Sequence, residues 1–282
     1  MRDWSTQCFR GAEMSARQSV ELRFHDVIER AASDYGDHTG ITRAKIIRWL
    51  SQFSPRSRPL AAKVLTSLTY YADNNVRTMA QRLVDATYHE YAAVAKNQIC
   101  FVPIGSAGSG AQQIARHLRS MRHVPRGCVI DLLELDRRAP TEVQVVVAFD
   151  DFSGTGQTIK EWWDLNESII RPKASEIVLG ILVLNCIARS PLEEITERIM
   201  PVEELPASAN VFHNDCIDFT IQEKTSLRRL CVRTKCGPKY VNGWGECGLL
   251  VVFKHGCPNN SIPILWHERE GEWEALFKRR VT

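Results

Sequence analysis

Short apolar runs that alternate with helical patterns constrain the fold of this chain more than any other feature of its sequence. Three such runs occupy residues 99–104, 143–149 and 177–184. Helical patterns at residues 111–121 and 157–169 lie between them. Strands without a polar face need cover on both sides, which is typical of a parallel sheet enclosed by helices. We therefore predict an α/β fold with helices on both faces of a parallel sheet.

The remaining elements divide the chain into two regions. Residues 129–135 predict another strand, residues 222–235 a helix, and residues 249–253 and 262–266 two late strands. Ahead of the sheet, helical spacing of apolar residues predicts helices at 15–32, 41–53, 60–71 and 76–94. The change of pattern near residue 98 predicts an all-helical N-terminal region at 1–96 and an α/β domain at 97–282.

Composition excludes several classes of protein. The 282 residues are 44% hydrophobic and 24% charged, which is typical of a soluble globular chain and excludes collagen-like, coiled-coil and wholly disordered proteins. No apolar run approaches the roughly 20 residues that span a bilayer, and the first residues do not resemble a signal peptide. Nine irregularly spaced cysteines argue against a disulfide framework. We expect a reduced, cytoplasmic protein that binds no membrane.

The most informative segment follows the second apolar run. The buried strand delivers Asp150 and Asp151 to the carboxyl edge of the predicted sheet, where ligands of open α/β sheets bind. A loop of small residues then turns into a helix, so hydroxyls, backbone N–H groups and the helix dipole together predict an anion site. Carboxylates beside a phosphate accept hydrogen bonds from sugar hydroxyls or bind hydrated Mg²⁺. A phosphorylated ribose fits both the acidic pair and the anion site. The plainer alternative is a solvated acidic turn before a capped helix.

The segment at residues 145–158 resembles the motif with which type I phosphoribosyltransferases bind 5-phosphoribosyl 1-diphosphate (PRPP). In both, a run of hydrophobic residues is followed by two acidic residues and then by Thr-Gly-x-Thr. The resemblance implies that Asp150 and Asp151 are the catalytic pair, that they hold the ribose 2′- and 3′-hydroxyls, and that they bind Mg²⁺ directly or through water. It also implies a set of residues around the 5′-phosphate, namely Ser153, Gly154, Thr155, Gly156, Gln157 and Thr158.

A glycine-rich stretch after the first apolar run has two interpretations. Its spacing from Gly105 to Gly110 matches a P-loop, but Ala111 and Gln112 stand where that loop needs Lys and Ser or Thr, which excludes a P-loop NTPase. In the phosphoribosyltransferase resemblance, this stretch touches pyrophosphate through backbone amides, and the residues implied are Gly105, Ser106, Ala107 and Gly108. A tight strand-to-helix turn without a ligand is the alternative.

The resemblance extends over residues 41–266 to a narrower family. Trp49 and Phe53 in the helical lead-in, both glycine-containing motifs and the tail from Asn242 to Trp266 resemble the phosphoribosyltransferase-like domain of prokaryotic conflict systems, PRTase-CE. The resemblance implies an effector of bacterial antiphage defence, including retron loci, with a defence-system protein or nucleic-acid complex as partner. Within the tail, the 258–260 Pro-Asn-Asn segment is either part of a lid or, more plainly, an ordered turn.

Two functions follow from this resemblance. The first is an enzyme that acts on PRPP or a 5-phosphoribosyl nucleotide at ribose C1 with Mg²⁺, by glycosyl transfer or by hydrolysis of an N-glycosidic bond. The second is a non-catalytic module that senses PRPP or a nucleotide and regulates a partner. The sequence shows no acceptor-base pocket, and it predicts no oligomeric state.

Two further residue groups have competing interpretations. Six basic residues and no acidic ones lie between residues 41 and 71, namely Arg43, Lys45, Arg48, Arg56, Arg58 and Lys63. This group is either a patch for nucleic acid or, more commonly, a solvated helix face. Four cysteines, Cys231, Cys236, Cys247 and Cys257, lack the CxxC spacing of a compact zinc site, so buried structural thiols are the favoured interpretation.

Overall fold

The chain forms two compact units in a computed structural model that describes residues 17–38, 40–105 and 109–279. The first, here called the sheet unit, contains residues 73–208. The second, called the split unit, combines residues up to 72 with residues from 209 onward. No helix in the described ranges is long and apolar enough to cross a bilayer.

Four parallel strands form the centre of the sheet unit, in the order β2(Ile99–Pro103), β3(Val145–Ser153), β4(Glu176–Asn185) and β5(Ile199–Leu205). In register, Val147 of β3 pairs with Phe101 of β2 and with Val178 of β4. Every residue of β3 is buried, as expected for a central strand covered on both faces. The predicted parallel sheet is therefore confirmed, and β5 is a strand that the sequence did not predict.

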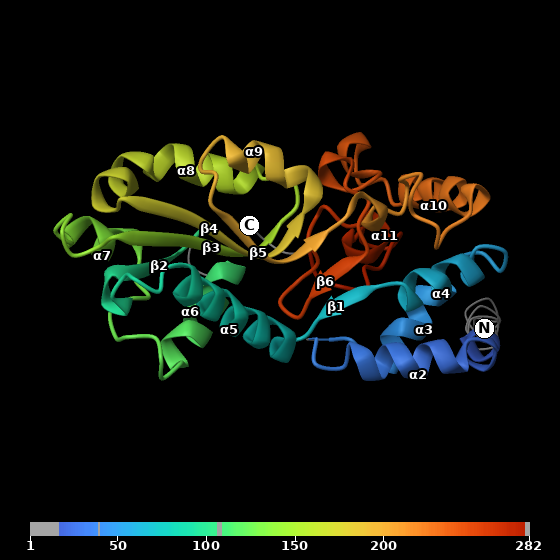
Figure 1. Ribbon diagram of the computed structural model, residues 1–282. Helices are drawn as coiled ribbons and strands as arrows, with labels where there is room; N and C mark the ends of the chain where they lie inside the picture. Colours follow the sequence, from blue (N-terminus) through green and yellow to red (C-terminus); the bar gives the residue numbers. More distant parts are fainter. Residues whose placement is uncertain (1–16, 39, 106–108, 280–282) are drawn as a thin grey trace. The chain divides into compact units, whose positions relative to one another are not determined.

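Helices cover both faces of this sheet. They are α5(Asp73–Glu90), α6(Gly110–Ser120), α7(Leu132–Arg137), α8(Gln157–Ile170) and α9(Arg189–Glu193). On one face, Val146 and Ala148 join Ile159 of α8 in a buried apolar cluster. On the other, Leu83 of α5 lies so close to Gly180 of β4 that an added Cβ would be 3.0 Å from it. Figure 1 shows α8 and α9 above the sheet and α5 and α6 below it.

The predicted strand at residues 129–135 is wrong. Val129 makes only an isolated bridge to Phe101, and the chain then enters α7. The reason is a capping box: Asp131 accepts a hydrogen bond from the Glu134 N–H at 2.8 Å, and Glu134 accepts one from the Asp131 N–H. These reciprocal bonds stabilise a helix start exactly where apolar content alone indicates a strand.

The split unit contains α2(His25–Asp34), α3(Arg43–Ser51), α4(Arg58–Thr66), α10(Ile221–Arg233) and α11(Pro263–Trp266). A small parallel sheet pairs β1(Thr69–Tyr71) with β6(Val251–Phe253). The predicted helix at 60–71 therefore ends early, at Thr66, and its last residues form β1. The predicted strand at 262–266 is also wrong, because Pro263 occupies a first-turn position of a helix, where its missing N–H costs nothing.

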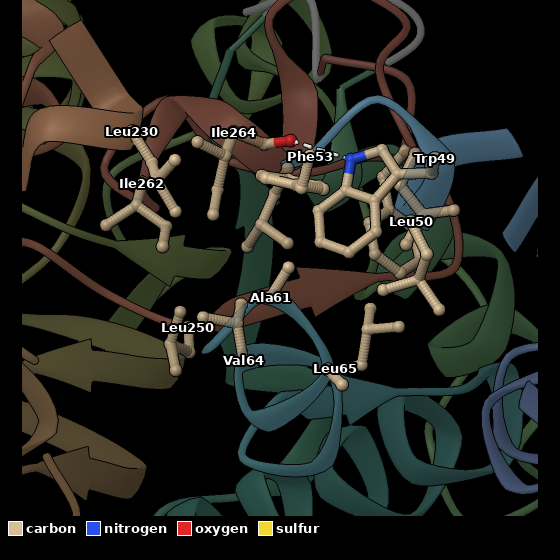
Figure 2. Close-up of a cluster of buried hydrophobic side chains, with 14 of the residues drawn as sticks. Trp49, Leu50, Phe53, Ala61, Val64, Leu65, Leu230, Leu250, Ile262 and Ile264 are labelled. Atoms are coloured by element: carbon tan, nitrogen blue, oxygen red, sulfur yellow. Dashed lines mark hydrogen bonds between the residues drawn. The ribbon is translucent and has the colours of Figure 1, made fainter. Parts of the chain in front are cut away.

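Apolar side chains from both ends of the sequence form one core in the split unit (Figure 2). Trp49 and Phe53 of α3 pack edge to face, with ring centroids 4.8 Å apart. The Trp49 indole N–H donates to the backbone oxygen of Ile264 at 3.0 Å, and Leu230 and Ile262 complete the C-terminal side. The N-terminal helices are thus packed on the C-terminal tail. The compact units divide the chain near residues 72 and 208, and the boundary between a helical region at 1–96 and an α/β domain at 97–282 stays a prediction.

Candidate functional site

The acidic pair lies near the carboxyl end of β3, in the centre of the sheet. Asp150 is 5% exposed and Asp151 is completely buried. Because successive strand residues point to opposite faces, the two carboxylates face different sides of the sheet. Asp150 is in register with Ile181, which belongs to the α8-side cluster, and its carboxylate accepts a hydrogen bond from the Asp151 N–H at 2.9 Å. The two carboxylates are therefore not equivalent.

The start of α6 lies directly against Asp151. A Cβ placed on Gly110 would be 2.2 Å from Asp151 Oδ2, well inside any real contact. Only glycine therefore fits at this position. The contact brings the end of the glycine-rich stretch to the acidic pair, although about forty residues separate the two motifs in the sequence. From the sequence, Gly110 was significant only for its spacing from Gly105, and the contact with Asp151 was not predicted.

Asn185 supports the loop after β3. It is a buried side chain at the end of β4, and its amide donates to the Gly154 backbone oxygen at 3.0 Å. The neighbouring Ser153 is also buried, and its hydroxyl has no hydrogen-bond partner in the described part of the chain. A buried hydroxyl without a partner is costly unless a ligand or water satisfies it. The sequence analysis missed Asn185, whose only signal was a polar residue directly after an apolar strand.

The loop ends at the N-terminus of α8. Gly156 is the N-cap residue in the left-handed region (φ 80°), and an added Cβ would lie 3.3 Å from the Ala188 backbone oxygen. Thr155 Oγ1 accepts a weak hydrogen bond from the Gln157 N–H at 3.4 Å. Thr158 is exposed in the first helical turn. The first N–H groups of an α-helix and its dipole favour an anion, and the predicted phosphate at this position stays a prediction.

The glycine-rich stretch is described only at its two ends. Gly105 follows β2 with φ 91°, a conformation that glycine adopts without strain. Ser109 is the N-cap residue of α6, and its hydroxyl donates to the Ile104 backbone oxygen at 3.4 Å. The predicted contacts of Ser106, Ala107 and Gly108 with pyrophosphate fall outside the described residues.

The acidic pair suits a magnesium ion that is shared with a substrate. Among residues 17–38, 40–105 and 109–279, no three His, Cys, Asp or Glu side chains are grouped to hold a metal. Mg²⁺ is usually bound by one or two carboxylates together with substrate phosphates, not by an all-protein cage. Asp150, beside the N-terminus of α8, fits that arrangement as it stands, whereas Asp151 is completely buried against the start of α6.

The tail cysteines have the properties of structural thiols. Cys231 and Cys257 are both fully buried, and this burial raises the pKa of each thiol far above its usual value. Metal ligation requires the thiolate, which such surroundings disfavour.

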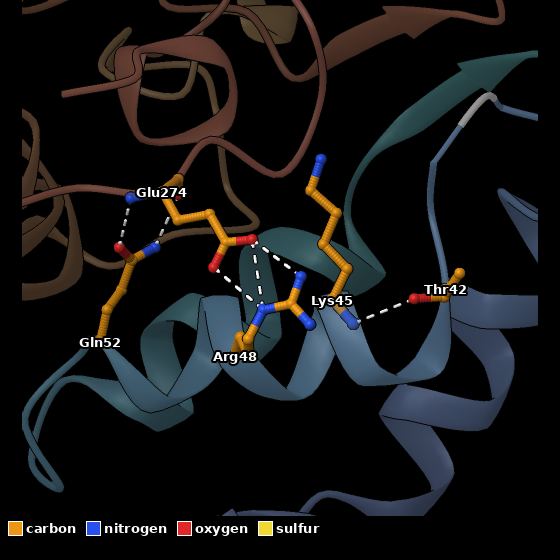
Figure 3. Close-up of polar contacts among 5 residues, drawn as sticks. All are labelled: Thr42, Lys45, Arg48, Gln52 and Glu274. Atoms are coloured by element: carbon orange, nitrogen blue, oxygen red, sulfur yellow. Dashed lines mark hydrogen bonds and ion pairs between the residues drawn. The ribbon is translucent and has the colours of Figure 1, made fainter. Parts of the chain in front are cut away.

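Carboxylates from distant parts of the sequence neutralise much of the basic stretch at 41–71. Arg48 forms an ion pair with Glu274 at 3.0 Å, and Gln52 adds hydrogen bonds to the backbone of Glu274 (Figure 3). Lys63 pairs with Glu223 at 2.8 Å. Arg43 pairs with Glu21 and Glu29. This arrangement favours the solvated, ion-paired face over a patch for nucleic acid.

The segment at 258–260 is built into the split unit as an ordered turn. The Trp244 N–H donates to the Asn259 backbone oxygen at 2.8 Å, and the Asn260 side-chain amide donates to the Trp244 oxygen at 3.0 Å. A Cβ on Gly243 would lie 2.1 Å from the Asn260 oxygen. These contacts support the plainer of the two interpretations.

Comparison with known proteins gives one match over most of the chain. The model of the PRTase-CE family matches residues 46–279. No curated protein matches. Among solved structures, UMP synthase from Leishmania donovani is 19% identical, with a TM-score of 0.33 over 55% of this chain and 32% of that one. The chain thus spans about a third of that protein's length. Orotate phosphoribosyltransferase from Mycobacterium tuberculosis, solved with PRPP, is 15% identical, with a TM-score of 0.29 over 46% of this chain and 74% of that one.

Proposed function

We propose that this chain, which belongs to the PRTase-CE family, acts on PRPP or a 5-phosphoribosyl nucleotide at ribose C1 with Mg²⁺. One observation supports the proposal most strongly: a single strand–loop–helix segment joins the acidic pair to the α8 N-terminus. The carboxylates lie near the end of a buried parallel strand, and the N–H groups at the start of α8 follow within a few residues. A ribose that carries a 5′-phosphate matches this order of groups.

Each part of the segment has a role in this proposal. The α8 N-terminus and the hydroxyls of Ser153 and Thr155 bind the 5′-phosphate. Asp150 and Asp151 bind the ribose hydroxyls, and Mg²⁺ bound with the substrate would neutralise phosphate charge. As the bond from C1 to the leaving group breaks, positive charge develops on the ribose ring. The carboxylates favour that charge electrostatically, and the fixed phosphate keeps the sugar oriented.

The burial of Asp151 favours the sensing alternative as a second candidate. In the structure both Asp151 carboxylate oxygens are inaccessible, and Gly110 is packed against them. A ribose hydroxyl can therefore reach Asp151 only if the start of α6 moves. Coupling between ligand binding and a helix movement is what a non-catalytic module needs in order to pass a signal to a partner.

Calorimetric titration of the full chain with PRPP and Mg²⁺ tests the site. We expect binding to the wild type and loss of binding in Asp150→Asn/Asp151→Asn. The control variant Asp164→Asn, which removes an exposed carboxylate of α8, should bind as the wild type does. Failure of the folded wild type to bind PRPP, or equal binding by the double variant, would contradict the proposal.

Turnover then separates the two candidates. Incubation with PRPP and a panel of nucleobases, or with nucleotides alone, should release pyrophosphate or free base if the chain is an enzyme. Binding without release of either product, in the presence of the natural partner, would instead support the sensing module.

We further propose that the chain is an effector of bacterial antiphage defence, associated with a retron and with a partner protein or nucleic-acid complex. Family membership is the support for this role. Phage plating on cells that express the complete locus should show protection, and Asp150→Asn/Asp151→Asn should abolish it. Full protection by the double variant would contradict a role for this pocket in defence.

A further inference from the structure

A groove lined by two arginines and several uncharged polar residues lies on the sheet unit, and neither Asp150 nor Asp151 lines it. It has a volume of about 550 Å³ and lies between the first half of α5 and the segment that follows α6. The α5 side consists of Asn74, Arg77, Thr78 and Gln81, whose spacing places them on one face of the helix. The other side includes Arg122 and His123.

The groove is positively charged and its arginines are not neutralised. Arg77 and Arg122 are exposed, and neither has a carboxylate within ion-pair distance in the described part of the chain. The nearby Asp73 and Asp85 do not line the groove. Asp73 faces His117 at 3.7 Å, and Asp85 faces His123 at 3.6 Å. These two arginines therefore differ from Arg48 of the split unit, whose charge Glu274 compensates.

Positive charge continues along the chain beyond the groove. Residues 110–127 contain four arginines and no acidic residue. Besides Arg122 these are Arg116, Arg119 and Arg126, all of them exposed. Arg119 donates to the Val129 backbone oxygen at 3.3 Å, which fixes part of this segment on the sheet unit. An extended basic segment suits a polyanion better than a single small anion.

We propose that this groove binds the phosphate backbone of a polynucleotide. Arginine, asparagine, threonine and glutamine side chains are the groups that contact phosphate oxygens in nucleic-acid complexes, and they make up most of the lining. A site for a free nucleotide would instead need apolar or aromatic surface for its base. Among the described lining residues there is no Phe, Tyr or Trp, and Met121 is the main apolar side chain. The groove therefore contacts backbone and does not select sequence.

Fluorescence anisotropy of the full chain tests this inference. The probes are labelled single-stranded RNA, single-stranded DNA and duplex DNA of about 20 nucleotides, which is longer than a typical single-strand binding site. We expect binding that weakens as salt rises from about 50 to 200 mM, because bound phosphates release counterions. Arg77→Gln/Arg122→Gln should lower the slope of log affinity against log salt by about 2, one for each phosphate contact removed.

A matched control removes the same charge elsewhere on the sheet unit. Arg82 of α5 and Arg137 of α7 are both exposed, do not line the groove and have no carboxylate within ion-pair distance among the described residues, and Arg82→Gln/Arg137→Gln should leave the salt slope unchanged. An equal loss in both double variants would mean that only bulk charge matters and would overturn the proposal. Absence of binding to all three probes at about 50 mM salt would also overturn it. The relative affinities for RNA and DNA identify the natural ligand.

The groove and the PRPP site are tested separately. Arg77→Gln/Arg122→Gln should bind PRPP as the wild type does, and Asp150→Asn/Asp151→Asn should keep its salt-dependent binding of polynucleotide. Loss of both activities in the groove variant, with its far-UV spectrum unchanged, would show that the two sites are not distinct and would contradict this assignment.

Discussion

Because Gly110 contacts Asp151, we expect Gly110→Ala to destabilise the protein, whereas helix propensity alone predicts that it stabilises. A methyl group at position 110 would lie 2.2 Å from Asp151 Oδ2, 2.3 Å from Cγ and 2.4 Å from Oδ1. Ordinary contacts begin at 3.4 Å, so the nearest oxygen is too close by 3.4 − 2.2 = 1.2 Å. Because Asp151 is completely buried, its carboxylate has no open space into which it can move.

Two opposing effects determine how much Gly110→Ala changes the free energy of unfolding. Replacing glycine by alanine within a helix normally stabilises a protein by roughly 0.5–1 kcal/mol. Forcing an extra methyl into a packed interior costs about 1–3 kcal/mol. We therefore expect a net loss of about 1–2 kcal/mol in the free energy of unfolding. Displacement of the carboxylate by about 1 Å should also reduce PRPP-dependent activity by about 10²-fold.

Urea unfolding of four variants isolates the contact. The set is the wild type, Gly110→Ala, Asp151→Ala and the double variant, which together form a double-mutant cycle. In the Asp151→Ala background the clashing atoms are absent, so Gly110→Ala should become neutral or stabilising. If Gly110→Ala stabilises the wild type, or changes both backgrounds equally, the proposed packing of α6 on Asp151 is refuted.

Three further predictions concern stability. Trp49→Phe leaves the buried Ile264 oxygen without its donor and should cost about 1–3 kcal/mol in urea unfolding; an unchanged midpoint would contradict the hydrogen bond. Burial raises the pKa of Tyr88 from 10.0 to about 12, so its stabilising contribution is complete below pH 10 and is lost as the pH rises toward 12. Tyr88→Phe should flatten that loss when unfolding is measured across this range, and an unaltered pH profile would contradict it. A fragment of residues 73–208 should unfold cooperatively by circular dichroism, whereas 97–282 should not, because it lacks α5; folding of the longer fragment alone would support the boundary at 96.

The sheet and the loop after β3 were predictable because their signals are local. A fully buried strand must be apolar along its whole length, and β3 is, up to its acidic end. Gly156 and the polar residues beside it mark a turn into a helix whatever the rest of the chain does. Such signals need only neighbouring residues, so one sequence is enough to read them.

The contacts that could not be predicted join residues that are far apart in the sequence. The Asn185 amide at the end of β4 donates to the Gly154 backbone oxygen in the loop after β3, and Gly110 at the start of α6 packs against Asp151 of β3. Neither segment contains a signal that identifies its contact partner. The helix α3 was predicted, but the hydrogen bond from its Trp49 to the Ile264 backbone oxygen was not. A core shared by both ends of the sequence cannot be read from a change of pattern near residue 98.

Charge shows the same dependence on distant partners, and the ion pairs agree with the interpretation of the basic stretch that the sequence favoured. For the six basic residues between 41 and 71, a solvated helix face was the favoured interpretation and a nucleic-acid patch the alternative. Glu274 and Glu223, from the far end of the sequence, form ion pairs with Arg48 and Lys63. Exposed pairs of this kind add little stability, at most about 1 kcal/mol each, but they remove the charge that a phosphate would need. Arg77 and Arg122, by contrast, have no carboxylate within ion-pair distance among the residues that the structure describes, and they are too far apart in sequence to form a run. A basic surface thus depends on which basic side chains lack a nearby carboxylate in the fold. The groove between α5 and the segment that follows α6, not the basic stretch at 41–71, is therefore the surface to test for a polynucleotide.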